Sequence, residues 1–396
     1  MLSLYLHFPF CKRKCSYCDF CSAAAEEGEI DAYCAALKKE IALTGRQFGE
    51  TPVDTVFLGG GTPSIVPAGR MGEVLSALRE HFTILPDAEF TSEANPGTLT
   101  GEWLETLKKA GANRLSLGVQ AKQERLLRIL GRIHTFSQAK DAFSMARAHG
   151  FSNLNADAMF ALPTQTMAEY LETLDALAAE KVTHLSAYSL ILEEGTPLYT
   201  AVKRGELALP DEDETADMME CGIDRLETLG YRRYEISNFA RPGYECKHNL
   251  GYWRQKNYLG LGLAAASLLP PGTGGGDAKY LRRTNTDRMS VYLKSLVEDK
   301  LPVGESRAVT PTEAMFETVM LGLRTVDGVG YADFAHMYGK RLTDVYGKAI
   351  GKLTAEGLLR PVTGEAPRLA LTRRGLALQN TALMAFMEEQ DSTRAD

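Results

Sequence analysis

The sequence predicts an α/β protein in which a parallel sheet is wound with helices between its strands, followed by a smaller module of helices and a hairpin. Over the first half of the chain, short apolar runs alternate with stretches of helical periodicity. Unusual residues, among them clustered cysteines and a run of glycines, fall at or near the carboxyl ends of the predicted strands. Beyond about residue 302 the pattern changes to helices followed by two short apolar runs.

The first half of the chain supplies the predicted parallel sheet. Its strands are expected over residues 2–8, 53–58, 89–93, 114–119, 154–160 and 184–192. Its helices are expected over residues 28–44, 70–81, 101–111, 136–150 and 167–181, where apolar residues recur every three or four positions. Alternating strands and helices form right-handed parallel crossover units. The carboxyl ends of such strands form the active face, so the residues gathered there are the candidate site.

The second half carries different signals. We expect an acidic linker and helix over residues 206–227, a strand-like run over 231–239 and a surface loop over the Pro- and Gly-rich residues 270–276. Predicted helices over 312–324, 331–338 and 342–356 precede apolar runs at 358–362 and 368–372, a pattern typical of a winged helix. The predicted units are therefore an α/β domain over 1–235, a linking region over 236–301 and a winged-helix-like domain over 302–396.

Composition and charge exclude several classes of protein. With 396 residues, 44% apolar and 24% charged, the chain is expected to fold as two globular units, and no run of about 18 apolar residues predicts a transmembrane segment. A net charge of −7 disfavours binding to nucleic acid. The predicted hairpin carries only Arg360, Arg368, Arg373 and Arg374, so packing against the α/β domain is favoured over DNA binding.

Cys11, Cys15 and Cys18 are the most informative residues of the chain. An iron–sulfur cluster usually takes four cysteine ligands, so three leave one iron open to a small molecule. Zinc is an alternative, with His7 or Cys21 as fourth ligand. A disulfide is disfavoured because the chain shows no secretory signal, which predicts a reducing, cytoplasmic location. The intervening basic residues 12–14 are either a solvated loop or a source of positive charge that favours thiolates.

Two other cysteines, Cys34 and Cys221, lie in helical patterns. We expect both to be small buried hydrophobic residues.

The C-x3-C-x2-C spacing resembles the signature of the radical S-adenosylmethionine (SAM) superfamily. Further segments, in the same order, resemble the branch that contains oxygen-independent coproporphyrinogen III dehydrogenase and the HemW-type haem chaperones. These segments are residues 59–64 (GGGTPS), 92–98 (SEANPGT), 117–120 (LGVQ), 130–134 (LGRIH) and 248–253 (HNLGYW). The similarity covers nearly the whole chain. It implies a partial (β/α)6 radical SAM barrel followed by the winged-helix-like domain.

The resemblance also implies the cofactors. Cys11, Cys15 and Cys18 match the cysteines that hold a [4Fe-4S] cluster, whose open iron takes the amine and carboxylate of SAM before its reductive cleavage. An electron donor such as flavodoxin is implied. The chain's task would be to orient the cofactors and exclude water and oxygen, because the cluster and SAM carry the difficult chemistry, and no side chain is predicted to be catalytic itself.

Glycines 60 and 61 with Thr62 match positions that hold the methionyl amine. From the residues alone, the glycine run indicates either a tight turn or a backbone that a ligand can approach to meet exposed N–H groups. Glu93 matches a position that contacts ribose. A buried carboxylate needs a partner, and the alternative to ribose is a salt bridge to Arg114 or Arg132.

The set Gln120, Arg132 and Asp157 offers an amide, a guanidinium and a carboxylate, which suit an amino-acid zwitterion. In the resemblance these positions bind a second SAM. Tyr5 and Tyr17 match positions that line the first and second SAM sites, although each tyrosine alone would be interpreted as core packing.

Within this branch, three features favour the chaperones. The dehydrogenases carry a further cysteine where this chain has Phe20, and they have an extension before the cluster loop, whereas only ten residues precede Cys11 here. His248 begins a motif similar to the H-N-x-x-Y-W sequence associated with haem binding, and imidazole is a haem ligand. Without the resemblance, His248 would be interpreted as a satisfied polar core residue. One departure is Ala266, which stands where the chaperones commonly have histidine.

The predicted function is therefore that of a haem chaperone that binds haem or a porphyrin and passes haem to acceptor proteins. The principal alternative is the coproporphyrinogen III dehydrogenase. A third alternative is a winged-helix regulator with a redox-sensing cluster, although such a sensor would have no use for Glu93 and Gln120 beside the cluster. No nucleic acid is expected as a partner, and peripheral contact with a membrane surface is compatible with the prediction.

Overall fold

A computed structural model describes residues 1–24, 26–271 and 277–395, so most of the loop predicted at 270–276 lies outside the described residues. Its centre is one 12-stranded sheet with the order β14-β13-β12-β11-β1-β4-β5-β6-β7-β8-β10-β9. The six predicted strands are all present, as β1 (Leu2–Phe8), β4 (Val53–Gly60), β5 (Ile84–Ala94), β6 (Arg114–Gln120), β7 (Asn153–Phe160) and β8 (His184–Ser189). Each pairs with the next in parallel, which confirms the partial barrel.

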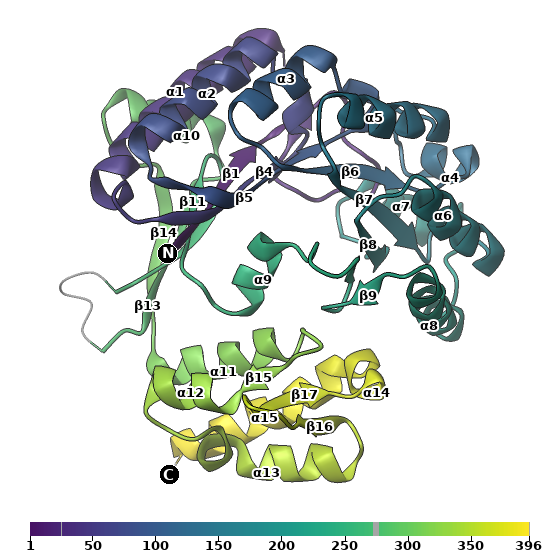
Figure 1. The fold of residues 1–396 in the computed structure, drawn as a ribbon, viewed down its shortest axis with the longest axis vertical. Helices are drawn as coiled ribbons and strands as arrows, with labels where there is room; N and C mark the ends of the chain where they lie inside the picture. The colour runs from purple at the N-terminus through teal and green to yellow at the C-terminus, as the bar shows by residue number, and fades with distance from the viewer. Residues whose placement is uncertain (25, 272–276, 396) are drawn as a thin grey trace.

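Helices cover the outer face of this sheet (Figure 1). They are α1 (Glu27–Phe48), α2 (Ala68–His81), α3 (Gly101–Lys109), α5 (Phe136–Ala148), α6 (Met167–Ala179) and α8 (Glu212–Thr228). Two shorter helices, α4 (Glu124–Ile129) and α7 (Pro197–Lys203), pack with Tyr17 in a separate apolar cluster. Local sequence sets their starts: Thr135 and Thr166 each form a capping box with a residue three positions later, which satisfies N–H groups of the first turn. Short 3-10 turns, η1 (Pro63–Ile65) and η2 (Pro96–Thr98), follow β4 and β5.

The core lies between the sheet and these helices. In β1 every residue except Tyr5 is buried, as in a strand covered on both faces. Leu4, Leu6 and Phe8 are fully buried in the largest apolar cluster of the described residues. The continuous apolar run near the amino terminus therefore forms a central strand of the sheet, and it ends directly before the first cysteine.

The sheet is wider than the sequence predicts. At one side, β11 (Tyr258–Leu261) pairs with β1 in parallel, and β12 (Ala266–Leu269), β13 (Tyr280–Asn285) and β14 (Val303–Val309) follow in antiparallel order. At the other side, β10 (Asn238–Ala240) and β9 (Arg232–Arg233) follow β8. Residues 236–301, predicted as a linking region, thus contribute strands to the same sheet. The bounds of the three predicted units stay a prediction.

Two further helices come from this region. Helix α10 (Met289–Val297) joins the outer layer beside α1, whereas α9 (Lys247–Trp253) lies on the opposite, concave side of the sheet, next to the C-terminal module (Figure 1). The position of α9 matters because it carries the motif that begins at His248.

The C-terminal module has its own apolar core, which includes Phe334, Tyr346 and Phe386. Its elements are α11 (Pro311–Gly322), β15 (Val329–Gly330), α12 (Tyr331–Tyr338), α13 (Leu342–Ala355), β16 (Leu359–Val362), β17 (Arg368–Leu371), α14 (Arg373–Ala377) and α15 (Gln379–Ala395). The predicted helices and hairpin are confirmed, and β15 adds a third strand to the hairpin. The arrangement is winged-helix-like.

Ion pairs fasten this module to the barrel. Arg373 lies 2.5 Å from a carboxylate oxygen of Glu220 and 2.7 Å from one of Asp224, both on α8. Arg282 of β13 holds Glu317 of α11 through two hydrogen bonds of 3.0 and 2.9 Å. The expected packing of this module against the barrel is therefore observed, and the guanidinium of Arg373 is engaged in ion pairs with the barrel.

Some local predictions differ from the structure. Residues 190–192 lie beyond the end of β8. Cys34 is buried as expected, but Cys221 is exposed on α8, because its position in the helical pattern turns toward solvent. Within the described residues, none of the helices is long and apolar enough to cross a membrane.

Two short strands, β2 (Phe10–Cys11) and β3 (Ala23–Ala24), pair outside the main sheet. They close the base of the segment that contains the clustered cysteines.

Candidate functional site

A cavity of about 490 Å³ opens at the carboxyl ends of the parallel strands, and we call it the rim cavity. Most of the predicted site residues line it: Cys11, Cys15, Tyr17, Cys18, Gly60, Gly61, Thr62, Glu93, Gln120, Arg132 and Asp157. Tyr5 and His248 do not. Eleven residues from separate strands and loops thus meet in one place, as expected for the active face of a parallel barrel.

The segment between β2 and β3, which carries the clustered cysteines and which we call the cysteine loop, is held at its base and at its middle. At the base, the Ala23 N–H donates to the Pro9 carbonyl at 2.9 Å beside the β2–β3 pair. At the middle, the Ser16 N–H donates to the Leu130 carbonyl at 3.0 Å, and the Ser16 hydroxyl donates to the Ile129 carbonyl at 2.7 Å. The cysteine loop therefore docks on residues 129 and 130, where the sequence segment 130–134 begins.

Polar groups surround the cysteine sulfurs. The Thr62 hydroxyl lies 3.6 Å from Cys11 Sγ, and Arg132 Nη1 lies 3.4 Å from Cys15 Sγ. Burial raises the pKa of the Cys18 thiol. Metal binding would reverse this effect, because a coordinated thiol is deprotonated.

The glycine run packs against the start of the cysteine loop. Gly60 has a φ of +107°, which favours glycine, and a Cβ at Gly61 would collide with the backbone of Phe10. The Gly61 N–H donates to the Phe8 carbonyl at 2.8 Å and the Thr62 N–H to the Phe10 carbonyl at 2.7 Å. The N–H groups of Gly61 and Thr62 are therefore already bonded to β1 and the cysteine loop, whereas the Gly60 N–H faces the side chain of Glu93. That this run holds the methionyl amine stays a prediction.

Glu93 is half-buried and lines the rim cavity, with its carboxylate near the glycine run. One oxygen accepts the Gly60 N–H at 3.3 Å. Burial, and next the charge of Asp157, raise the pKa of Glu93 to about 8. Neither Arg114 nor Arg132 forms a salt bridge with it among the ion pairs of the described residues. The carboxylate thus keeps acceptor capacity for a hydroxyl-bearing ligand.

Gln120, Arg132 and Asp157 face the cavity from β6, the segment after α4, and β7. The Gln120 side-chain carbonyl accepts the Tyr188 hydroxyl at 3.0 Å, and its backbone φ is +73°. Asp157 accepts the Asn155 amide at 2.7 Å, and burial raises its pKa. Arg132 also donates to the Gly118 carbonyl. The three side chains form the predicted set of polar types on one wall.

The two predicted tyrosines have different positions. Tyr17 lines the rim cavity, and burial raises its pKa. Tyr5 lies behind the cavity wall, where its hydroxyl bonds to His7 Nδ1 at 3.0 Å and its ring stacks on Phe57. His7 in turn bonds the Cys21 carbonyl through Nε2 at 2.8 Å. In this arrangement Tyr5 supports the end of the cysteine loop from below.

His248 is buried on α9 with both ring nitrogens engaged. Nδ1 bonds the Thr55 hydroxyl at 2.8 Å and Nε2 the Tyr252 hydroxyl at 3.0 Å. Burial lowers its pKa to about 3. Its ring also stacks on Phe57 at a centroid distance of 5.1 Å. The imidazole is neutral and satisfied, so ligating haem iron requires one of these hydrogen bonds to open.

The sequence did not single out several residues of the rim cavity. Those with polar groups include Asn95, Ser116, Asn155, Ser186, Tyr188 and Asn238. A signal existed for some: Asn95 falls inside the segment 92–98, and Ser186 and Tyr188 alternate toward the end of a predicted strand. Arg114, which the sequence offered as a partner of Glu93, lines the cavity from the start of β6.

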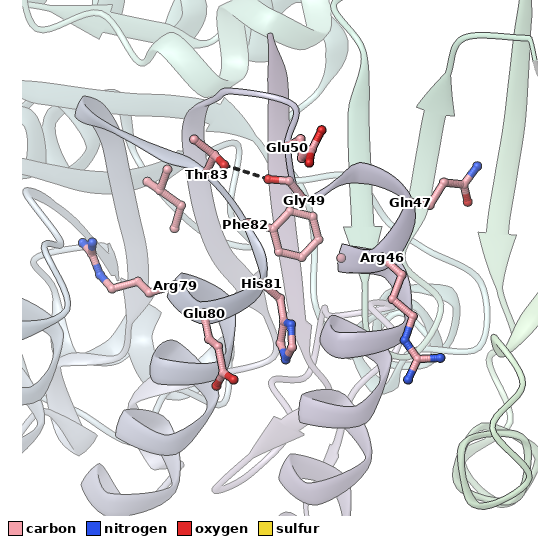
Figure 2. A pocket seen from close by; sticks show the side chains of 11 residues that line it. Arg46, Gln47, Gly49, Glu50, Arg79, Glu80, His81, Phe82 and Thr83 are labelled. Atoms are coloured by element: carbon pink, nitrogen blue, oxygen red, sulfur yellow. Dashed lines mark hydrogen bonds between the residues drawn. The ribbon is translucent and has the colours of Figure 1, made fainter.

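A second hollow of about 680 Å³ lies near the opposite ends of the strands (Figure 2). It is bounded by the ends of α1 and α2 and the start of β5, where the Thr83 hydroxyl donates to the Gly49 carbonyl at 2.9 Å. Arg46 and Arg79 point away from one another in Figure 2. Although larger, this hollow gathers none of the predicted site residues, and we assign the chemistry to the rim cavity.

The donor set of the rim cavity fits the implied cofactors. Three cysteines, two of them partly exposed, line its mouth, and an acceptor carboxylate lies deeper at Glu93. In the part of the chain that the structure describes, no group of three or more His, Cys, Asp or Glu side chains is arranged to hold one metal ion. A cubane cluster differs from a single ion, because each cysteine binds a different iron.

Comparisons with known proteins agree with this geometry. The family model of the radical SAM superfamily matches residues 5–177, and that of the HemN C-terminal domain matches residues 309–378. The haem chaperone HemW of Bacillus subtilis is 35% identical over 98% of this chain and 100% of its own length. HemW of Lactococcus lactis is 35% identical over 97% of each chain. Among solved structures, coproporphyrinogen III oxidase (HemN) from Escherichia coli, a radical SAM enzyme, has a TM-score of 0.82 and 25% identity, covering 97% of this chain and 89% of its own.

Proposed function

Because the chain belongs to the HemW family within the radical SAM superfamily, we propose that it is a haem chaperone. In this proposal it holds a [4Fe-4S] cluster and SAM in the rim cavity, binds haem and passes it to haem-accepting proteins. An electron donor such as flavodoxin would reduce the cluster, and the location would be cytoplasmic.

One observation carries the cofactor part of the proposal. Cys11, Cys15 and Cys18 line the mouth of the same cavity as Gly60, Thr62 and Glu93, although these residues come from different parts of the chain. Chance placement of structural residues would not be expected to bring three cysteines into one cavity with an acceptor carboxylate. When bound, the cluster and SAM supply one-electron chemistry.

The residues of the chain have distinct proposed tasks. The three cysteines bind the cluster, and Arg132 donates a hydrogen bond to Cys15 Sγ at 3.4 Å. Glu93 accepts the hydroxyls of ribose, which favours its ionised form against the effect of burial. Gln120, Arg132 and Asp157 offer a matching set of donors and acceptors to an amino-acid group, on the wall where a second SAM would bind.

The experiment for the cofactors is anaerobic reconstitution with iron and sulfide, followed by spectroscopy with and without SAM. We expect about four irons per chain and a spectrum that changes when SAM is added. Cys15→Ala should lose the cluster, whereas Cys221→Ala, which alters the exposed cysteine of α8, should keep it. Stoichiometric zinc, or a cluster spectrum insensitive to SAM, would overturn the proposal.

The haem part of the proposal is supported by the names of the curated relatives and by the motif at residues 248–253. We propose His248 as a haem ligand that is reached only when its hydrogen bonds open. Titration with haemin should give a Soret band that His248→Ala shifts or weakens. His336→Ala, on an exposed face of α12, controls for haem bound by surface imidazoles and should leave the band unchanged.

The dehydrogenase alternative is tested by the same preparation. Phe20, exposed at the cavity mouth, occupies the position where the dehydrogenases carry cysteine. We therefore expect no conversion of coproporphyrinogen III to protoporphyrinogen IX under anaerobic conditions. Turnover of that substrate would favour the dehydrogenase over the chaperone.

A further inference from the structure

Helix α9 connects the rim cavity to the haem motif. Asn249 lines the rim cavity, while the preceding residue, His248, is only 1% exposed and bonds Thr55 on β4. Consecutive residues of one short helix thus take part in two different environments. A movement of α9 that frees His248 must also displace Asn249 from the cavity wall.

Glu89 of β5 holds the first turn of this helix. One carboxylate oxygen accepts the Lys247 N–H at 2.9 Å, and the other accepts the His248 N–H at 3.0 Å and the Cys246 thiol at 3.3 Å. Glu89 is buried, so these hydrogen bonds are largely shielded from water. They satisfy N–H groups that have no partner within the helix.

The same end of α9 is tied to the cavity by a buried chain of hydrogen bonds. The side-chain amide of Asn155 donates to Asp157 of the cavity at 2.7 Å. The side-chain oxygen of Asn155 lies 2.6 Å from His184 Nδ1. His184 Nε2 lies 2.8 Å from the Tyr234 hydroxyl, which accepts the Cys246 N–H at 3.3 Å. A ligand that changes the surroundings of Asp157 therefore acts on a contiguous network that ends at α9.

The opposite end of α9 contacts the C-terminal module. Arg324 lies over the Trp253 ring at 5.0 Å, and the Gln255 side chain bonds Glu317 at 3.3 Å. With both ends fastened, the observed position of α9 is a closed arrangement in which His248 is unavailable.

We propose that Glu89 is a positioning residue that keeps α9 closed, and that occupancy of the rim cavity by SAM is coupled through Asn249 to haem binding at His248. The proposal rests on the proposed function. SAM in contact with Asn249 stabilises the closed position and weakens haem binding. By linkage, haem weakens SAM binding by the same factor, so SAM acts as a release signal for haem.

Titration with haemin, followed by the Soret band, tests the positioning role. In Glu89→Gln the amide N–H₂ faces backbone N–H donors, so the closed position loses stability and more of the protein can bind haem. We expect the apparent haem affinity to rise about ten-fold, which corresponds to about 1.4 kcal/mol. Combining Glu89→Gln with His248→Ala should remove the gain.

A matched control comes from Glu40 of α1, another buried carboxylate with three hydrogen-bond donors. Its partners, Gly262, Asn285 and Tyr292, all lie outside α9. Glu40→Gln should therefore leave haem affinity unchanged or weaken it through general loss of stability. A gain of affinity confined to Glu89→Gln distinguishes positioning of α9 from a structural effect.

The coupling is tested by repeating the titration with SAM on the reconstituted protein. SAM should weaken haem binding of the wild type, and Asn249→Ala should abolish this effect, which keeps the proposal testable if Glu89→Gln does not fold. Equal or weaker haem binding in a folded Glu89→Gln overturns the positioning role, and a wild type whose haem affinity ignores SAM overturns the coupling. If neither the wild type nor Glu89→Gln binds haem, the proposed function itself fails.

Discussion

At the scale of single residues, the rim cavity is defined by groups that are costly to bury and therefore need partners. Glu93 is the clearest case, because burial and the neighbouring Asp157 raise its pKa to about 8. An acid whose pKa is higher in the folded state binds its proton more tightly there than in the unfolded chain. The free energy of unfolding must then fall as the pH rises between the two pKa values.

We therefore predict that the apoprotein loses stability as the pH rises from about 4.5 to about 8, and that Glu93→Gln reduces this loss. The limiting slope from one group is about 1.4 kcal/mol per pH unit. Urea unfolding of both proteins at several pH values measures it. Parallel curves for the wild type and the variant would contradict the prediction.

The glycine run gives a second prediction at this scale. In Gly61→Ala the new methyl group would collide with the Phe10 backbone, one residue before Cys11, so the cysteine loop must shift. We expect lower iron content after reconstitution. Gly69→Ala in α2 is the control, because a Cβ there meets nothing within 4 Å. Full cluster loading of Gly61→Ala would show that the loop tolerates the shift.

Residue types at the strand ends were sufficient to predict most of the residues that line the rim cavity, because parallel order brings the carboxyl ends of the strands to one edge of the sheet. They could not predict that Tyr5 and His248 lie outside the lining of the rim cavity, or that His248 is buried. The partner of His248 is Thr55, 193 positions away in the sequence, and nothing in the local pattern of either residue indicates the contact.

At the scale of elements, the parallel strands were predictable and the added strands were not. The former are continuous apolar runs buried on both faces. In contrast, all but one residue of β14 are exposed and the interior of β13 is half-buried, so neither shows the alternation or the apolar run that identifies a strand. The pairing of β13 with β12, and of β14 with β13, decides their structure.

The contact between β13 and α11 gives a prediction at this scale. Glu317 is 13% exposed and Arg282 is 33% exposed, so removing the carboxylate leaves a partly buried guanidinium without its partner. We expect Glu317→Ala to lower the free energy of unfolding by about 2 kcal/mol, between the effects for surface and buried pairs. Denaturant unfolding measures this difference.

Glu105→Ala is the matched control for that measurement. Its partner Lys109 is 79% exposed, and such pairs contribute little to stability. We expect a change within about 0.5 kcal/mol. Equal losses in the two variants would mean that the contact with α11 contributes no more than a surface pair.

At the scale of the whole molecule, the charge and the docking of the C-terminal module argue against nucleic-acid binding. The net charge is −7, and two of the arginines on or beside the hairpin are paired, Arg368 with Asp333 and Arg373 with Glu220 and Asp224. Phosphate contacts require free cationic groups that displace counterions.

We predict that a labelled DNA duplex shows no change in fluorescence anisotropy with the protein at micromolar concentration, at low or physiological salt. Binding that weakens steeply as salt is added would contradict this prediction and would support the winged-helix regulator instead.

The sequence by itself determined the parallel barrel, the three cysteines at its rim and the composition of the cavity, because short-range periodicity fixes strands and parallel order fixes where they end. Only the tertiary structure decided which polar groups are already satisfied. The N–H groups of Gly61 and Thr62 bond β1 and the loop, His248 bonds Thr55, and Glu89 holds α9. These contacts join residues far apart in sequence, and their geometry depends on packing that no local pattern encodes.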